Sequence, residues 1–160
     1  MIGWLLDTNV TAEIISPRGS LRVKQWAAEQ DETSLYLSVL TLGEYDKGIA
    51  GLEEDDPRRA IYRNTRDGLA ARFVDRVLSV SDRVVYRWGA ISGSVRRRTG
   101  HPAPVIDTLL AATAIEHDLY LATRNVRDVR YSGAAIFNPW EDDPGCAPIL
   151  PGARRHRSPT

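Results

Sequence analysis

One apolar segment carries a single charge where a helix is expected. Residues 104–125 read PVIDTLLAATAIEHDLYLATRN, and Asp107 is the only charged residue in the first half of this segment. A carboxylate that is buried without a partner costs several kcal/mol, so Asp107 requires a cation, a strong hydrogen bond or a solvent-lined cleft. The segment continues into a strand-like run that ends in Thr123, Arg124 and Asn125. Two polar clusters so close together indicate a metal or phosphate site.

Strand-like and helical patterns alternate along the chain. We expect short strands at residues 2–6, 35–39, 77–80, 119–122 and 134–137, and helices near residues 9–16, 21–29, 41–49, 59–77, 82–98 and 104–116. This alternation predicts an α/β fold with a central, mainly parallel sheet and helices on both faces. In such sheets, ligands bind beyond the carboxyl ends of the strands, where Asp7 and Thr123 fall.

The length and composition are those of a soluble globular protein. At 160 residues, with 42% hydrophobic and 26% charged residues, the chain is expected to form one domain. We place this domain at residues 1–140 and expect residues 141–160, rich in Pro, Gly and Arg, to be a poorly ordered tail. The single cysteine, Cys146, excludes an internal disulfide framework. With no bilayer-length apolar run and no basic leader, we expect no membrane segment, no signal peptide and a cytoplasmic location.

The charges are balanced overall but unevenly distributed. A net charge of zero argues against a protein that coats nucleic acid nonspecifically. The second half nevertheless contains three arginine groups, at residues 96–98, at residues 124, 127 and 130, and at residues 154, 155 and 157. These groups are compatible both with solvated helix ends and with phosphate contacts.

Each polar candidate also has a purely structural explanation. Asp7 follows a buried strand and can be the N-cap of the next helix. Glu44 lies three residues after a threonine and fits the capping box, in which the glutamate reaches back to the cap amide. Asn125 and Asp128 can be turn formers. Asp107 has the weakest structural explanation, because a favourable helix-dipole interaction is too small to account for a carboxylate among apolar neighbours.

If these acids converge, they need a cation. Carboxylates that share a site repel one another and raise their own pKa values, and a divalent metal resolves this. Hard oxygen ligands suit Mg²⁺ or Mn²⁺. The three histidines and the lone cysteine have no zinc-site spacing, and the chain lacks a Walker A run, a G-x-S-x-G elbow and a G-x-G-x-x-G motif. The reaction types that remain for this chain are metal-assisted phosphoryl transfer and metal-assisted hydrolysis.

Four pieces of the sequence together resemble a known family. They are LLDTNV at residue 5, LSVLTLGEYDKGI at residue 37, the long segment from residue 104 to NVRDV, and IFNPW at residue 136. In order and spacing they are similar to PIN-domain ribonucleases, specifically VapC- and FitB-type toxins of bacterial toxin–antitoxin pairs. The resemblance implies a three-layer α/β/α domain with an acidic pocket that binds Mg²⁺ or Mn²⁺.

The resemblance also assigns roles to residues. By position, Asp7, Glu44 and Asp107 are the first three acids, with Asp7 and Asp107 as the principal metal ligands. Some relatives have the fourth acid where this chain has Asn125, and others use an acid that resembles Asp128. Because Asn125 keeps an oxygen ligand but loses a charge, Asp128 is expected to supply the charge of the fourth acid. Thr8, Asn9, Ser38 and Thr123 are expected to line the pocket, and Arg124 and Arg127 to position phosphates. An RNA substrate, a cognate antitoxin and a homodimer are implied as partners.

Other functions remain open at this stage. Residues 7–11 (DTNVT) partly match the D-x-D-x-T motif of haloacid-dehalogenase-like phosphatases, but the second aspartate is missing. That family and receiver-like signalling domains both require a late lysine, whereas the only lysines here are Lys24 and Lys47. A PIN fold that has lost catalysis and serves as a binding module is the third alternative.

Overall fold

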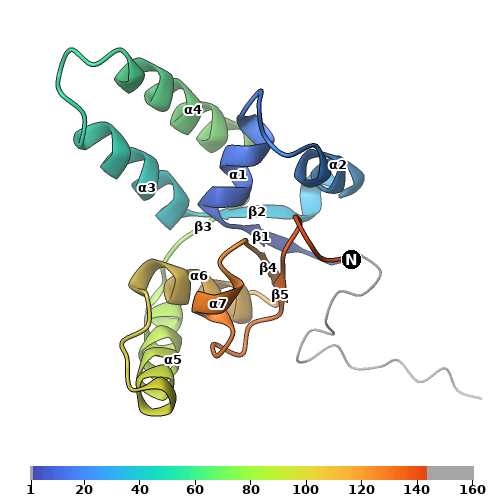
Figure 1. Ribbon diagram of the computed structural model, residues 1–160, viewed down its shortest axis with the longest axis vertical. Helices are drawn as coiled ribbons and strands as arrows, with labels where there is room; N and C mark the ends of the chain where they lie inside the picture. Colours follow the sequence, from blue (N-terminus) through green and yellow to red (C-terminus); the bar gives the residue numbers. More distant parts are fainter. Residues whose placement is uncertain (1, 144–160) are drawn as a thin grey trace, which may run out of the picture.

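Five short parallel strands form the centre of the molecule. The computed structural model describes residues 2–143 (Figure 1). The strands are β1 (Trp4–Leu6), β2 (Leu35–Ser38), β3 (Val77–Leu78), β4 (Tyr120–Ala122) and β5 (Ile136–Phe137). Their order is β3-β2-β1-β4-β5, and all four pairings are parallel. From β1 the chain therefore adds β2 and then β3 on one side of the sheet. It then returns to add β4 and β5 on the other side of β1.

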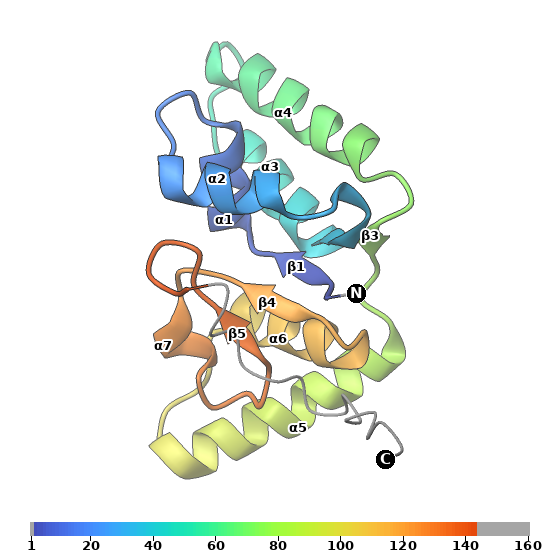
Figure 2. The ribbon, with the colours of Figure 1, turned by 90° about the vertical axis from the view of Figure 1, so that its right-hand side faces the viewer.

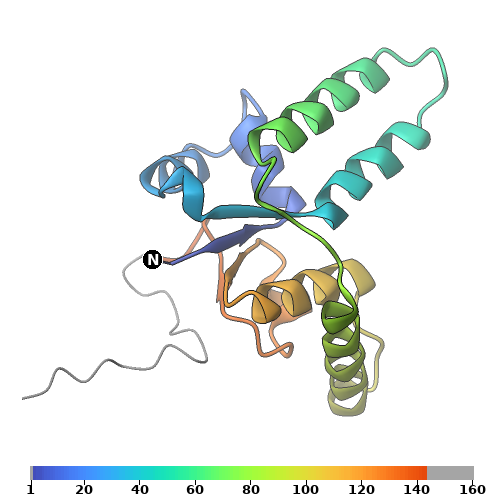
Figure 3. The same cartoon turned by 180° about the vertical axis from the view of Figure 1, so that it is seen from behind.

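Helices cover both faces of this sheet, which confirms the expected three-layer α/β/α architecture. On one side lie α1 (Thr8–Ile15), α2 (Leu21–Glu29), α3 (Val39–Ala50) and α4 (Arg58–Arg72). On the other side lie α5 (Asp82–Thr99), α6 (Val105–Glu116) and the short α7 (Val126–Val129), as Figure 3 shows from behind. A single 3₁₀ turn (Glu32–Ser34) precedes β2. Most of the predicted tail, residues 144–160, lies outside the described residues.

The alternation of side chains along β1 divides the core in two. Trp4 and Leu6 pack with α1 to α4, in a cluster that includes Trp26, Phe73 and Phe137. Leu5 points to the opposite face and packs with residues of α6 and α7. Because successive side chains of a strand point to opposite faces, a three-residue strand buried on both sides must be apolar throughout, as β1 is.

The sequence-based helix at residues 59–77 was too long. Helix α4 ends at Arg72, and Val77 pairs with Leu37 in the sheet. The apolar period continues past the end of the helix because Phe73 is fully buried in the core beside it. Ile61, expected on the apolar face, is 60% exposed. The short helix α7 was not predicted at all, since four residues carry no periodic signal.

None of the helices between residues 2 and 143 has both the length and the apolar character needed to span a bilayer.

Candidate metal centre

The strand order places the carboxyl ends of β1 and β4 side by side at one edge of the sheet. Asp7 follows β1, and Thr123 follows β4. The backbone amide of Asp7 donates to the carbonyl of Ala122 at 3.0 Å, which extends the pairing of the two strands by one residue. The chain turns in opposite directions from β1 and β4, and a crevice at such a switch point is the usual ligand site of an open parallel sheet.

Asp7 is nearly buried, with 5% of its surface exposed. It occupies the N-cap position of α1, but within the described chain its carboxylate makes no capping hydrogen bond. Instead, Oδ2 accepts from Asn9 Nδ2 and from Thr123 Oγ1, each at 2.6 Å. The helix therefore begins directly after Asp7, while the Asp7 side chain hydrogen-bonds to Asn9 and Thr123 instead of capping it.

Glu44 does not form the capping box that its sequence pattern allowed as an alternative. Helix α3 begins at Val39, and its N-cap is Ser38, whose Oγ accepts from the amide of Leu40 at 3.2 Å. Glu44 consequently lies in the second turn, too far along the helix to reach back to a cap amide. Its carboxylate accepts a hydrogen bond from Thr8 Oγ1, so it reaches across to α1.

Asp107 is the third residue of α6 and is half-buried. Its Oδ1 accepts from Asn125 Nδ2 at 3.1 Å, a neutral partner that leaves the negative charge uncompensated. The hydrogen bond links the start of α6 to the segment that follows β4, and it supplies part of the partner that an acid in this apolar segment requires.

These side chains surround one cavity of about 340 Å³. Its lining consists of Asp7, Thr8, Asn9, Ala12, Glu44, Ile106, Asp107 and Asn125. Three carboxylates come from three separate parts of the chain, and none of the described lining residues is basic. The structure thus brings the first three predicted acids to one cavity, and their roles stay a prediction.

The pKa of Asp7 reflects this crowding of negative charge. Burial raises the pKa of Asp7 above its usual 3.8, the hydrogen bond from Thr123 lowers it, and the nearby charges of Asp107 and Glu44 raise it again. The net direction is upward. An acid that is buried beside two other acids gains most from a bound cation.

The donor set fits a hard divalent cation. All polar atoms offered by the lining side chains are carboxylate, hydroxyl or amide groups, which suit Mg²⁺ or Mn²⁺. Within residues 2–143, no group of three or more His, Cys, Asp or Glu side chains is arranged so that together they could hold a metal ion. Mg²⁺ keeps several of its waters and needs only one or two carboxylates, so an open, roomy arrangement of this kind is sufficient.

The remaining predicted residues are not among those that line the cavity. Thr123 is buried and supports Asp7 from behind, and Ser38 is buried as the cap of α3. Arg124 is exposed, and its guanidinium lies 5.2 Å from the ring centroid of Trp140. Arg127 and Asp128 are exposed on α7, outside the described lining of the cavity. The assignment of Asp128 as the fourth acid stays a prediction.

One polar contributor was missed by sequence reasoning. Thr41 is fully buried, and its Oγ1 lies 3.4 Å from Oγ1 of Thr8, the hydroxyl that donates to Glu44. A buried threonine one turn before an acid on the same helix was a signal for this role, but the capping-box pattern concealed it.

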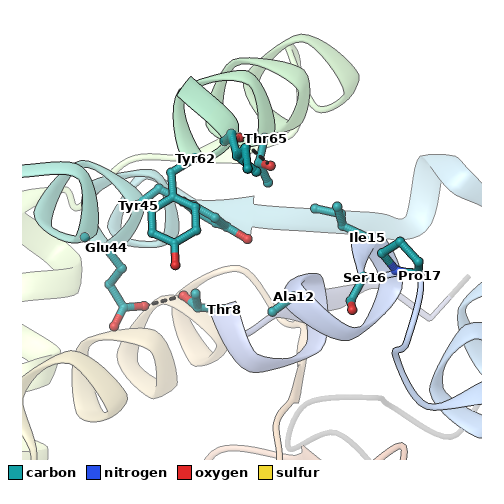
Figure 4. A pocket seen from close by; sticks show the side chains of 11 residues that line it. Thr8, Ala12, Ile15, Ser16, Pro17, Glu44, Tyr45, Tyr62 and Thr65 are labelled. Carbon is teal, nitrogen blue, oxygen red and sulfur yellow. Dashed lines mark hydrogen bonds between the residues drawn. The ribbon is translucent and has the colours of Figure 1, made fainter. Parts of the chain in front are cut away.

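A larger apolar groove of about 510 Å³ adjoins the acidic cavity between α1, α3 and α4 (Figure 4). Ile15, Pro17, Tyr45, Ile61 and Tyr62 contribute most of its apolar surface. Thr8 and Glu44 line both the groove and the acidic cavity, so the two are continuous. Figure 4 shows the Thr8–Glu44 hydrogen bond at the end of the groove.

Comparisons with known proteins agree with this geometry. Toxin FitB of Neisseria gonorrhoeae is 30% identical over 86% of this chain and 99% of its own length. The VapC ribonuclease Y4jK of Sinorhizobium fredii is 32% identical over 86% of this chain and 97% of its own length. The crystal structure of FitAcB from N. gonorrhoeae matches with a TM-score of 0.74 and 30% identity, over 86% of this chain and 98% of that one.

These relatives extend over nearly the whole described region, as does a model of one protein family. That model, the PIN domain, matches residues 4–133. The sequence-based resemblance is confirmed, and the chain belongs to the PIN-domain family.

Proposed function

We propose that this protein is a divalent-metal-dependent endoribonuclease and the toxin of a toxin–antitoxin pair. The observation that carries the proposal is the cavity in which Asp7, Glu44 and Asp107 converge without a basic residue among the described lining. The names of two relatives, Toxin FitB and a VapC ribonuclease, support the same reaction class and the same biological role.

The three acids have different roles in this proposal. Asp7 and Asp107 hold the principal Mg²⁺ or Mn²⁺ ion, while Glu44 holds bound water or a second, weaker ion. When bound, the ion lowers the pKa of a water that attacks the phosphodiester and stabilises charge on the leaving oxygen. Because water is the nucleophile, the products carry a 3′-hydroxyl and a 5′-phosphate.

The residues around the acids position them. Thr123 holds Asp7 by a 2.6 Å hydrogen bond, and Asn125 holds Asp107 at 3.1 Å. Second-sphere hydrogen bonds of this kind fix the orientation of metal-binding carboxylates. Arg124 and Arg127 lie on the segment that leaves the site and can contact phosphates of the substrate.

A cleavage assay tests the proposed reaction. Purified protein is incubated with transfer, ribosomal and messenger RNA in Mg²⁺, in Mn²⁺ and in a chelator, beside the variants Asp7→Asn and Asp75→Asn. Asp75 is an exposed acid between α4 and β3 and makes a matched control. We expect metal-dependent cleavage, lost by at least about 100-fold in Asp7→Asn and retained in Asp75→Asn. Metal binding without cleavage of any RNA would instead favour a non-catalytic binding module.

The apolar groove offers a place for the antitoxin. We propose that a segment of a cognate antitoxin lies between α1, α3 and α4 and directs a basic side chain into the acidic cavity, where it displaces the metal. Support comes from the continuity of the groove with the cavity through Thr8 and Glu44, and from the charge of the cavity itself. Ile61, 60% exposed in the groove, provides apolar surface for such a segment.

Substitution in the groove tests this docking mode. The variant Ile61→Glu should lose inhibition by the antitoxin and keep its nuclease activity, because Ile61 lies outside the acidic cavity. Val74→Glu, at an exposed apolar residue outside the groove, serves as the control and should remain inhibited. Undiminished nuclease activity of the purified wild-type pair would show that the antitoxin does not block the site.

The family resemblance also supports a homodimer and a cytoplasmic location as parts of the proposal. Light scattering coupled to size exclusion should give twice the mass of the 17.8 kDa chain. A monomeric mass at micromolar concentration would contradict the homodimer.

A further inference from the structure

Six arginines in the second half of the described chain have charges that no carboxylate neutralises. Arg83 and Arg87, in the first half of α5, both form ion pairs with Glu116. Within residues 2–143, no ion pair involves the exposed residues Arg96, Arg97 and Arg98 at the end of α5, or Arg124, Arg127 and Arg130 around α7. The two halves of α5 thus differ in whether their positive charge is compensated.

Two of these arginines stack on one tyrosine. The guanidinium carbons of Arg98 and Arg130 each lie 4.6 Å from the ring centroid of Tyr131, which is 36% exposed. Stacking restrains a guanidinium group without using its N–H donors, so these donors remain available to an anion. Arg98, Arg130 and Tyr131, with Arg96, Arg97 and Arg127 beside them, are called the basic surface below.

The basic surface adjoins the acidic cavity. Helix α7 begins one residue after Asn125, which lines the cavity, and α5 is joined through residues 100–104 to the helix that carries Asp107. In Figure 2, α7 and the yellow C-terminal end of α5 lie on the same side of the molecule. The contact of Arg98 with Tyr131 holds these two segments together.

The acids in these same segments are few. Asp128 is the one carboxylate of α7, and the described last turn of α5 contains three arginines and no acid. Glu141 and Asp142 lie beside α2, where Arg22 donates to both of their backbone carbonyls. The excess of positive charge is therefore centred on Arg98, Tyr131 and Arg130 rather than spread along the whole edge.

A nuclease with three carboxylates in its cavity faces an electrostatic difficulty, because the cavity repels the phosphate backbone that it must receive. A separate cationic surface beside the cavity offsets this repulsion and holds the strand by its flanking phosphates. Single-stranded RNA is also recognised by stacking of unpaired bases on aromatic rings and on guanidinium planes, both of which the exposed Arg–Tyr–Arg stack presents.

We propose that the basic surface is the docking site for the RNA strand that flanks the scissile phosphate. This inference rests on the proposed ribonuclease function, and it goes further by assigning substrate binding to residues outside the acidic cavity. It implies that RNA long enough to occupy both the cavity and the basic surface binds more tightly than an RNA that fills the cavity alone.

The test measures RNA binding separately from cleavage. In the full-length chain with the non-cleaving Asp7→Asn change, fluorescence anisotropy gives the Kd of a labelled 20-nucleotide RNA at several salt concentrations. We expect Arg98→Gln/Arg130→Gln to weaken binding at least about tenfold and to lower the salt slope by about 1.4, as expected for two lost phosphate contacts on a single strand. The control Arg83→Gln/Arg87→Gln, on the same helix, should leave both quantities unchanged.

Two further measurements show whether the loss of RNA binding is specific to the basic surface. With Asp7 intact, the change Arg98→Gln/Arg130→Gln should raise KM for long RNA and leave kcat unchanged. In this variant, long RNA should no longer have a lower KM than short oligonucleotides. Tyr131→Phe, which keeps the ring, should bind RNA as the wild-type residue does, and circular dichroism should show that both variants are folded.

The outcomes separate this inference from the proposed function. Equal Kd values for the test and control pairs would overturn the inference, even if the wild-type protein cleaves RNA. Loss of dimer or antitoxin binding in the test pair, with RNA affinity unchanged, would likewise overturn it and identify a protein interface. A Kd that depends on Arg98 and Arg130 would support RNA docking on the basic surface. If in addition no RNA is cleaved by the wild-type protein, the nuclease proposal fails and the basic surface remains an RNA-binding site without a scissile phosphate beside it.

Discussion

Thr123 donates a 2.6 Å hydrogen bond to Asp7, although 116 residues separate them in the chain. Thr123 has 1% of its surface exposed, so water cannot replace this donor if it is removed. The bond lowers the pKa of Asp7 against the larger, opposite effect of burial. The ionisation of the first acid therefore depends on a residue at the end of a different strand.

Removing this hydroxyl should weaken metal binding without unfolding the protein. In Thr123→Val the pKa of Asp7 rises further, and the carboxylate loses the bond that orients it. We expect an affinity for Mn²⁺ lower by about 10- to 100-fold, the usual effect of losing a second-sphere partner. Isothermal titration measures it, and the acid limb of the pH–activity profile should move to higher pH.

Thr113→Val is the matched control for that change. Thr113 is equally buried, but its hydroxyl donates to the carbonyl of Leu109 within α6, away from the cavity. Its replacement should leave metal affinity and the pH profile as they are. A similar loss of affinity in both variants would assign the effect to general packing.

Asp7→Asn should stabilise the metal-free protein at neutral pH while it abolishes cleavage. The folded-state pKa of Asp7 is raised above 3.8, so the folded state binds this proton more tightly than the unfolded state does. Stability therefore falls as the pH rises from about 3.8 through the folded-state pKa, and the full penalty is present above it. The neutral amide avoids this penalty.

Thermal unfolding in a chelator, followed from pH 4 to pH 8, checks this expectation. The melting temperature of Asp7→Asn should exceed that of the wild type at pH 8, and the difference should shrink towards pH 4. Mn²⁺ at about 100 times its Kd should stabilise the wild type by about 2.7 kcal/mol and leave the variant almost unaffected. A variant that is less stable at every pH would contradict the raised pKa.

Asn125 and Asp128 compete for the fourth position of the acidic site. Asn125 lines the cavity and donates to Asp107, whereas Asp128 is exposed on α7. We expect Asn125→Ala to lower kcat about 10- to 100-fold, through loss of the partner that orients Asp107, and Asp128→Asn to have a smaller effect. Single-turnover cleavage measures both, and a larger loss in Asp128→Asn would establish the acid of α7 as the fourth residue.

Ser38→Ala should reduce stability but not metal affinity. Ser38 caps α3 as Ser81 caps α5, each accepting from a backbone amide in the first turn. Both alanine variants should lose about 1 kcal/mol of unfolding free energy in urea, the typical cost of a lost N-cap. Weaker Mn²⁺ binding in Ser38→Ala alone would show instead that Ser38 belongs to the pocket lining.

The sequence predicted the layers of this fold because they follow from the alternation of strands and helices. It also placed Asp7 and Thr123 at strand ends, and the parallel sheet brought them to the same edge. The strand order itself was not predictable, since it depends on which strand pairs with β1 after α6. That pairing is made by backbone atoms, for example the Asp7 amide and the Ala122 carbonyl, and leaves no trace in side-chain patterns.

The errors came from local signals that tertiary contacts overrode. The capping-box pattern at Thr41 placed the start of the helix near residue 41, yet the N-cap is Ser38 and Glu44 is free to meet Thr8. The apolar period through Phe73 and Val77 indicated one long helix, but Val77 pairs with Leu37 in the sheet. The apolar groove had no sequence signal, because Ile61 and Tyr62 look like ordinary helix residues until α3 and α4 diverge.

The position of β4 beside β1 also has a consequence for the order of synthesis. Asp7 and Glu44 leave the ribosome early, but Asp107, Thr123 and Asn125 follow only when most of the domain has been made. Strand β1 can pair with β4 only after more than a hundred further residues have been synthesised, and such distant pairing is slow to form. A growing chain thus lacks a complete acidic cavity until β4 is in place, so the proposed metal site is assembled only near the end of synthesis.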